Sequence, residues 1–439
     1  MILSCQNLSK TFVDRPILKQ ASFQLEEHEK AAIVGVNGAG KTTLLKMIIG
    51  QLPADEGLIT FAKDKTFGYL AQQSDLSSSH TIYEELLSVK QDLISMEQQL
   101  RDLEESMKHC EGTQLEEIMD RYTRMTHDFE VRGGLLYKSE LTGVLKGLSF
   151  LDEDFDKQIS TLSGGQKTRV SLAKLLLQSP DLIILDEPTN HLDIASISWL
   201  ETYLRSYKGA VLIVSHDRYF LDRVVTKVIA IENGLVRSYA GNYSDYAAKA
   251  AMLRKAAVNA YLKQQEEIHH QQQVIDKLKS FNREKSIKRA ESREKMLDKM
   301  ELLEKPVEIR DDMHLKLTPQ IISGNDVLSI EDLSKHFGSL TLFEHVDIEI
   351  KRGEHVAIIG DNGTGKTTLL KIINELESMD SGQIRLGSKV EIGYYDQEHH
   401  VLHSEKTLFD EISDDYPALT NTQIRNTLAA FLFTGDDVF

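Results

Sequence analysis

Residues 35–42 read Gly35-Val36-Asn37-Gly38-Ala39-Gly40-Lys41-Thr42 and match the pattern G-x-x-x-x-G-K-[ST]. The apolar run 31–34 predicts a buried strand before this loop, and the run 43–49 predicts a helix after it. Glycines let successive backbone N–H groups turn inward around phosphates, and the helix N-terminus adds a positive dipole end. We therefore predict an α/β fold with a nucleotide site, in which Lys41 meets the β- and γ-phosphates and Thr42 a Mg²⁺ ion.

The chain contains this loop twice. Gly360-Asp361-Asn362-Gly363-Thr364-Gly365-Lys366-Thr367 repeats the pattern and predicts the same strand–loop–helix context. Further landmarks recur at the same offset, namely Phe12 with Phe337, Gly68-Tyr69 with Gly393-Tyr394, and Gln72 with Gln397. Chance could match one short motif, but not several landmarks in one register. The sequence therefore predicts a duplicated domain.

Length and composition exclude several classes of protein. At about 150 residues per domain, 439 residues give roughly three units, and 41% hydrophobic with 27% charged residues is a globular mixture. The apolar stretches fall far short of the roughly 20 residues that span a bilayer. Cys5 and Cys110 cannot form a disulfide framework or a metal cluster. We expect a cytoplasmic protein without a membrane partner, and the net charge of −17 excludes a general cationic coat for nucleic acid.

Two further motifs lie between the loops. The apolar run Leu182–Leu185 predicts a strand that ends in Asp186 and Glu187, which fits a carboxylate near Mg²⁺ and a group that polarises water. The run Ser163-Gly164-Gly165-Gln166 opens an amphipathic helix through about Leu177, and such a start is an anion site. Taken alone, each motif also fits a plain strand end or a plain capped helix.

The stretch from Tyr243 to about Pro306 has no internal proline or glycine and is rich in strong helix formers. It predicts two long helices with a break near residues 280–282. Between Lys279 and Lys295 there are seven basic residues against three acidic ones, although the whole chain is acidic. A basic hairpin tip is suited to contact with nucleic-acid phosphates, and a solvated helical spacer is the alternative.

Together these motifs resemble the ATP-binding cassette (ABC) family over essentially the whole chain. The family's Walker A loop, Gln loop, signature, Walker B strand, D-loop and switch histidine occur here in the family's order, at Gly35–Thr42, Gln72, Leu162–Gln166, Leu182–Glu187, Asn190–Asp193 and His216. The resemblance implies that Glu187 and His216 are catalytic. It also implies that Phe12 and Phe337 stack on adenine, where core packing is the alternative.

The resemblance implies two sets of ligand contacts. The ATP contacts comprise the aromatic, loop, signature and Walker B residues of both copies: Phe12, Gly35, Asn37, Gly38, Ala39, Gly40, Lys41, Thr42, Thr43, Gln72, Ser163, Gly164, Gly165, Gln166, Asp186, Phe337, Gly360, Asn362, Gly363, Thr364, Gly365, Lys366, Thr367, Thr368 and Gln397. The Mg²⁺ contacts are Thr42, Gln72, Asp186, Thr367 and Gln397. ATP and GTP remain open, because an aromatic ring stacks on either purine.

Two cassettes joined by a charged helical linker resemble the ABC-F branch. The sequences of residues 186–193, 215–222 and 241–244 resemble the corresponding segments of that branch. The resemblance implies a ribosome-associated ATPase that docks in the tRNA exit site, with the linker hairpin directed toward the tRNA in the peptidyl site. The tip would then contact ribosomal RNA or tRNA through Arg283, Lys285, Lys288, Arg289 and Arg293. Some members relieve stalled translation, and others confer resistance to ribosome-targeting antibiotics.

We expect a first cassette over residues 1–241, with a helical subdomain over about 75–160. A linker over 242–322 and the N-terminal part of a second cassette over 323–439 would follow. ABC cassettes pair head to tail, so we expect a C-terminally truncated fragment whose composite sites are incomplete, or a chain completed by another. The competing functions are the ATPase subunit of a membrane transporter and a DNA-repair or chromosome-associated ATPase.

Overall fold

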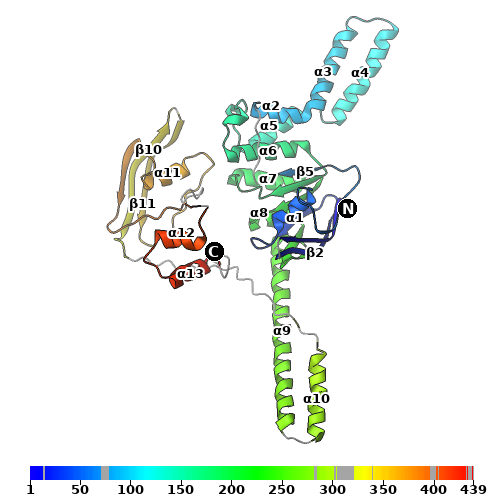
Figure 1. Ribbon diagram of the computed structural model, residues 1–439. Coiled ribbons are helices and arrows are strands. Elements are labelled where there is room, and N and C mark those ends of the chain that lie inside the picture. The colour runs from blue at the N-terminus through cyan, green and yellow to red at the C-terminus, as the bar shows by residue number, and fades with distance from the viewer. Residues whose placement is uncertain are drawn as a thin grey trace. The chain divides into compact units, whose positions relative to one another are not determined.

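The computed structural model describes residues 1–12, 15–70, 79–280, 284–300, 303, 321–338, 340–395, 402–403, 405–431, 433 and 438. The chain divides into two compact units, Met1–Pro306 and Val307–Phe439 (Figure 1). Among the helices of these described ranges, none combines the length and the apolar character that crossing a bilayer requires.

The central sheet of the first unit has six strands in the order β5-β6-β7-β3-β8-β9. All neighbours are parallel except β8 and β9. The inner strands β3, β6 and β7 are buried along their whole length, because helices and a second sheet cover both faces. The strands are β3 (Lys30–Val34), β5 (Phe67–Leu70), β6 (Leu182–Asp186), β7 (Ala210–Val214), β8 (Lys227–Glu232) and β9 (Leu235–Ala240).

Two hydrophobic cores lie on the two faces of this sheet. One core joins the sheet to α1 (Lys41–Ile48) and to an antiparallel sheet of β1 (Leu3–Phe12), β2 (Arg15–Leu25) and β4 (Glu56–Phe61). The other core is formed with α5 (Tyr137–Gly147), α6 (Gly164–Gln178), α7 (Ile194–Ser206) and α8 (Arg218–Val224). The predicted helices after the first loop and after the signature are thus confirmed, as α1 and α6.

The helical part of the first cassette includes a projecting hairpin. It is formed by α3 (Gln91–Met107) and α4 (Thr113–Val131), which extend away from the central sheet (Figure 1). Tyr137 holds its base, because the hydroxyl donates to Glu97 Oε2 at 2.6 Å. The remaining short helices of this part are α2 (Ile82–Leu87), η1 (Ser88–Lys90), η2 (Asp152–Asp154) and η3 (Ile159–Thr161).

The predicted linker helices are present as α9 (Tyr243–Ser280) and α10 (Glu284–Asp298), which lie side by side (Figure 1). At 1.5 Å per residue, the 38 residues of α9 extend about 57 Å. Ile275 and Ala290 are fully buried where the two helices pack, and Lys279 pairs with Glu294 at 2.6 Å. The break predicted near residues 280–282 is confirmed, because α9 ends at Ser280.

The second unit contains an antiparallel sheet β11-β10-β12, on which α11 packs. Its elements are β10 (Asp326–Phe337), β11 (Leu340–Lys351), α11 (Lys366–Ile373), β12 (Ser381–Leu386), α12 (Leu408–Asp415) and α13 (Asn421–Ala430). The buried strand expected before Gly360 is not formed, since residues 355–360 carry no strand and are exposed. In the first unit β3 is buried between β7 and β8, and the described residues of the second unit supply no parallel strands to cover 355–360.

Candidate nucleotide-binding site

The first phosphate-binding loop connects β3 to α1 as the sequence predicted. Gly40 takes φ = 99° immediately before α1 begins at Lys41, a left-handed conformation that glycine adopts without strain. A Cβ atom on Gly40 would lie 2.5 Å from Ile17 Cγ2. The turn therefore depends on glycine for its backbone angle and for the close approach of β2.

A cavity of about 510 Å³ opens beside this loop. It brings together the predicted residues of the aromatic position, the loop, the Walker B end, the D-loop and the switch position: Phe12, Asn37, Gly38, Gly40, Lys41, Thr42, Thr43, Asp186, Glu187, Asn190 and His216. Phe12 is 45% exposed, so it is not a core residue. Ile17 and Val214 also line the cavity, and sequence reasoning missed both because an apolar residue in a strand indicates core packing and carries no site signal.

Lys41 is buried at the start of α1. Its Nζ donates to the carbonyl oxygens of Gly35 at 2.8 Å and Val36 at 3.2 Å. Burial lowers the pKa of this ammonium, and the carboxylates of Glu187 and Asp186 act against that shift. A lysine ammonium has three donors, so the third remains for a phosphate oxygen.

Two carboxylates end β6 at the edge of the cavity. Asp186 is 4% exposed, and burial, followed by the charge of Glu187, raises the pKa of its carboxyl group. Asp186 together with the Thr42 hydroxyl offers the hard oxygen donors that Mg²⁺ prefers, and a bound cation would offset the cost of burying the carboxylate. These residues therefore fit a Mg²⁺ ion.

Glu187 is held in an unusual backbone conformation with φ = 49°. Its backbone N–H donates to Val214 O at 2.8 Å, and its carboxylate Oε2 accepts from the backbone N–H of His216 at 3.2 Å. The His216 ring Nε2 lies 3.4 Å from Glu187 Oε1. The strand ends of β6 and β7 thus bring Glu187 and His216 together, with the carboxylate facing the cavity.

Some predicted residues lie elsewhere. Gly35, Ala39 and the signature Ser163-Gly164-Gly165-Gln166 do not line this cavity. Ser163 caps α6, because its Oγ accepts from Gln166 N at 3.3 Å and Gln166 Oε1 accepts from Ser163 N at 3.0 Å. The predicted contacts Gln72 and Gln397 lie outside the described residues.

The second loop repeats the local geometry of the first. Lys366 begins α11, and its Nζ donates to Gly360 O at 2.8 Å and Asp361 O at 2.5 Å. Thr364 Oγ1 donates to Asp361 O, and Phe337 is 49% exposed at the end of β10. Thr367 and Thr368 lie in the first turn of α11, directly after Lys366.

The predicted RNA-contacting residues divide into three groups. Arg283 and the side chain of Lys285 lie outside the described part. Lys288 and Arg289 are exposed on α10. Arg293 instead donates to Gln271 Oε1 on α9, so this cation contributes to the contact between the two helices.

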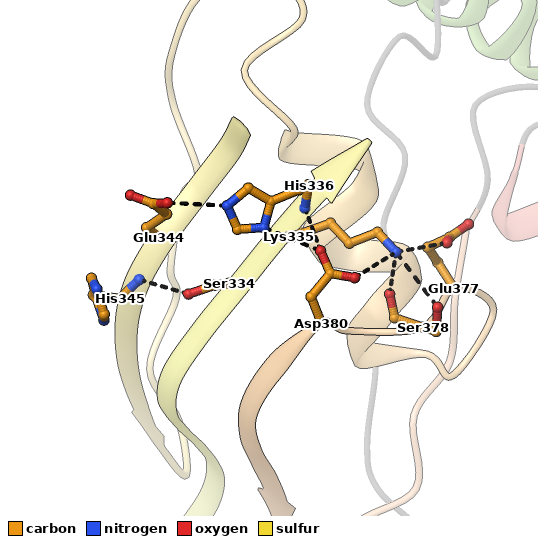
Figure 2. Close-up of polar contacts among 8 residues, drawn as sticks. All are labelled: Ser334, Lys335, His336, Glu344, His345, Glu377, Ser378 and Asp380. Carbon is orange, nitrogen blue, oxygen red and sulfur yellow. Dashed lines mark hydrogen bonds and ion pairs between the residues drawn. The ribbon is translucent and has the colours of Figure 1, made fainter. Parts of the chain in front are cut away.

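In the β11-β10-β12 sheet region of the second unit, His336 is paired with two carboxylates (Figure 2). His336 Nε2 lies 3.0 Å from Glu344 Oε1, and His336 Nδ1 lies 3.2 Å from Asp380 Oδ2. These hydrogen bonds, the one to Glu344 first, raise the pKa of His336. His345 is paired with Asp332 on the same sheet, which likewise raises its pKa.

A pH dependence of stability follows. When a histidine has a higher pKa in the folded protein than in the unfolded one, its protonation stabilises the fold at every pH below the unfolded pKa. This stabilisation is lost as the pH rises through the folded pKa. We therefore expect the thermal stability of this region to fall as the pH rises above 6.5. His336→Thr, which installs the residue found at the matching position 11 of the first cassette, should reduce that dependence in thermal melts. Equal pH profiles for parent and variant would show that His336 does not contribute.

Comparison with known proteins agrees with the two cassettes and the linker. A family model described as ABC transporter matches residues 18–190 and 343–434, and a second model of the same description matches residues 229–317. The putative ATP-binding protein YdiF of Bacillus subtilis is 47% identical over 441 residues, which cover 100% of this chain and 68% of the relative. The ABC transporter F family member 2 of Arabidopsis thaliana is 35% identical, over 89% of this chain and 58% of that relative. The energy-dependent translational throttle protein EttA of Mycobacterium tuberculosis is 30% identical, over 99% of this chain and 77% of that relative.

The chain belongs to the ABC-F family. The predicted duplication is confirmed, because one cassette model matches the chain twice. This ABC-F chain is thus an ATP-binding protein with two cassette regions and the extension segment between them. It spans 58–77% of the length of the three relatives.

Proposed function

We propose that this ABC-F protein hydrolyses ATP to ADP and phosphate and uses the reaction to act on the ribosome. The observation that carries the ribosomal part is the α9–α10 hairpin, a long paired-helix arm with a basic tip on an acidic chain. The relative named as a translational throttle supports it. The same resemblance favours contacts with ribosomal RNA and tRNA near the exit and peptidyl sites.

For the first cassette, the cavity supports a division of roles. Phe12 stacks the adenine, and Lys41 together with the N–H groups of the loop holds the β- and γ-phosphates. Thr42 and Asp186 hold Mg²⁺, which when bound neutralises charge that develops on the phosphates. In the second cassette Phe337 and Lys366 take the corresponding roles, with Thr367 as the Mg²⁺ contact and the backbone N–H groups of 362–368 around the phosphates.

Glu187 is the general base of the proposed reaction. Its carboxylate accepts a proton from the attacking water, and the water oxygen bonds to the γ-phosphorus as the bond to ADP breaks. The His216 backbone N–H orients the carboxylate, and the His216 ring, 3.4 Å from the carboxylate, would contact the γ-phosphate. The signature residues Ser163–Gln166, at the start of α6, would contact a nucleotide phosphate, as the resemblance to the family implies.

The hairpin tip provides the test of the ribosomal role. Replacing Arg283, Lys285, Lys288 and Arg289 with Gln should weaken ribosome binding and flatten its dependence on salt. Each lost phosphate contact should reduce the slope of log K against log[salt] by about 0.7–0.9. The measurement is ribosome co-sedimentation at several salt concentrations, with the protein locked in the ATP state by Glu187→Gln.

A matched control lies on the same arm. The cations Lys249, Arg254, Lys255 and Lys263 lie on α9 at least 17 residues before its end at Ser280, and their replacement removes the same charge. The control variant should keep the parental salt slope. Identical slopes for all three proteins would identify the tip as a solvated spacer. Sedimentation with membranes instead of ribosomes would favour the competing function, the ATPase subunit of a transporter.

Relief of stalling and antibiotic protection are two finer roles of such a protein. Expression of the chain in a sensitive strain should raise the tolerated dose of a ribosome-targeting drug only if it protects the ribosome. An unchanged dose together with faster release of stalled ribosomes would assign it to stall relief.

A further inference from the structure

A buried lysine lies against the proposed adenine-stacking ring in each cassette. Lys10 Nζ lies 5.7 Å from the ring centroid of Phe12, and Lys335 Nζ lies 4.9 Å from that of Phe337. Each lysine precedes its aromatic residue by two positions and is buried, whereas each ring is about half exposed. The same arrangement therefore occurs twice in the chain, once in each compact unit.

A carboxylate anchors each lysine and the backbone beside it. Asp55 Oδ1 pairs with Lys10 Nζ at 2.6 Å, and Asp55 Oδ2 accepts from the backbone N–H of Thr11 at 2.8 Å. Asp55 thus holds the two residues directly before Phe12, across a separation of 45 positions in the chain.

The second cassette repeats this anchor (Figure 2). Asp380 Oδ1 lies 3.7 Å from Lys335 Nζ, and Asp380 Oδ2 accepts from the backbone N–H of His336 at 2.6 Å. Lys335 has additional acceptors, because its Nζ donates to Glu377 Oε1 at 3.1 Å and to Ser378 O at 2.6 Å. The first cassette has Leu52 and Pro53 at the positions that match Glu377 and Ser378.

A cation over one face of a ring is attracted by the ring's π-electrons and restricts its orientation. A ring held before binding loses less conformational freedom when a base stacks on its open face, so the complex gains affinity without a new contact to the ligand. The cation also has to be fixed, and in both cassettes a carboxylate from the adjacent strand end fixes it.

We propose that Lys10 with Asp55, and Lys335 with Asp380, are positioning residues that orient Phe12 and Phe337 for stacking on the purine. The inference rests on the proposed function, because it assumes that the two rings meet the base. It also predicts a difference between the cassettes. Asp55→Asn releases Lys10 from its carboxylate, whereas Asp380→Asn leaves Lys335 paired with Glu377, so the first change should weaken stacking more.

The test isolates one site of the 439-residue chain at a time. With Lys366→Ala disabling the second loop, ATP binding by the first cassette is measured by displacement of a fluorescent ATP analogue. Lys10→Met should weaken ATP binding about 3- to 10-fold. The affinity for inorganic tripolyphosphate, which has no base, should stay unchanged. Lys10→Arg should restore most of the ATP affinity, because it keeps a cation near the ring.

Two controls separate positioning from a general loss of structure. Lys19→Met removes an exposed lysine from β2, and it should change neither affinity. In a chain that already carries Phe12→Ala, Lys10→Met should have no further effect, because the ring through which it acts is gone. The mirror experiment uses Lys335→Met and Phe337→Ala with Lys41→Ala disabling the first loop.

The outcomes distinguish failure of the positioning role from failure of the proposed function on which it rests. If Phe12→Ala leaves ATP affinity unchanged, the stacking role itself is wrong. If Phe12→Ala weakens ATP binding but Lys10→Met does not, the inference alone is overturned. It is also overturned if Lys10→Met weakens tripolyphosphate and ATP equally, or if its effect persists without the ring, because both results would indicate a structural role.

Discussion

Replacing Glu187 with Gln should slow ATP hydrolysis by about 10²- to 10⁴-fold and leave ATP binding intact. The amide keeps the size of the side chain and still accepts the hydrogen bond from the His216 backbone. It cannot take a proton from water at neutral pH, so only the chemical step is lost. Phosphate release in a single-turnover assay with ribosomes, beside equilibrium binding of ATP, measures the two effects separately.

The matched control is Glu29→Gln, which makes the same chemical change directly before β3, at the end of that strand away from the phosphate-binding loop. Glu29 pairs with Lys227 away from the cavity, so its replacement should leave turnover unchanged. Turnover by Glu187→Gln at the parental rate, with the second site disabled through Lys366→Ala, would exclude Glu187 as the general base.

Replacing Lys41 with Met should weaken ATP binding to the first cassette by about 10²- to 10⁴-fold. Charge-assisted hydrogen bonds to phosphate contribute roughly 1.5–3 kcal/mol each. Contact with both the β- and γ-phosphates requires two of them, one from the third ammonium donor and one from a donor that leaves its loop carbonyl. Its ammonium is already desolvated and held at the loop, so little reorganisation opposes the contact. Calorimetric titration with ATP, in the chain that carries Lys366→Ala, measures the loss.

Lys46→Met is the control for charge, because Lys46 is exposed in the last turn of the same helix α1. It removes one positive charge near Asp186 without touching the cavity, so ATP affinity should change by less than about 3-fold. Equal losses for the two lysines would indicate a general electrostatic effect in place of a direct phosphate contact. Thermal melts confirm that both variants remain folded.

The local elements of this protein could be predicted from the sequence. The loop at 35–42, the helix after Ser163 and the strand before Asp186 are each encoded by neighbouring residues, through glycine conformation, capping and apolar periodicity. The linker helices were predictable for the same reason, since their composition favours helix and Ser280 ends the first. The repeat of the loop also required only the order of residues.

The tertiary structure decided which of these residues meet. Asp186 and His216 line one cavity because the parallel strands β6 and β7 end at the same edge of the central sheet, and Phe12 reaches the same cavity from the end of β1 in the antiparallel sheet. No local sequence pattern predicts this proximity. The anchor of Lys10 by Asp55 depends on the register between β1 and β4, and the contact of Arg293 with Gln271 depends on how α9 and α10 pair. The prediction of a strand before Gly360 was wrong for the same reason. An apolar run becomes a buried strand only when neighbouring strands complete its hydrogen bonds and other elements cover both its faces.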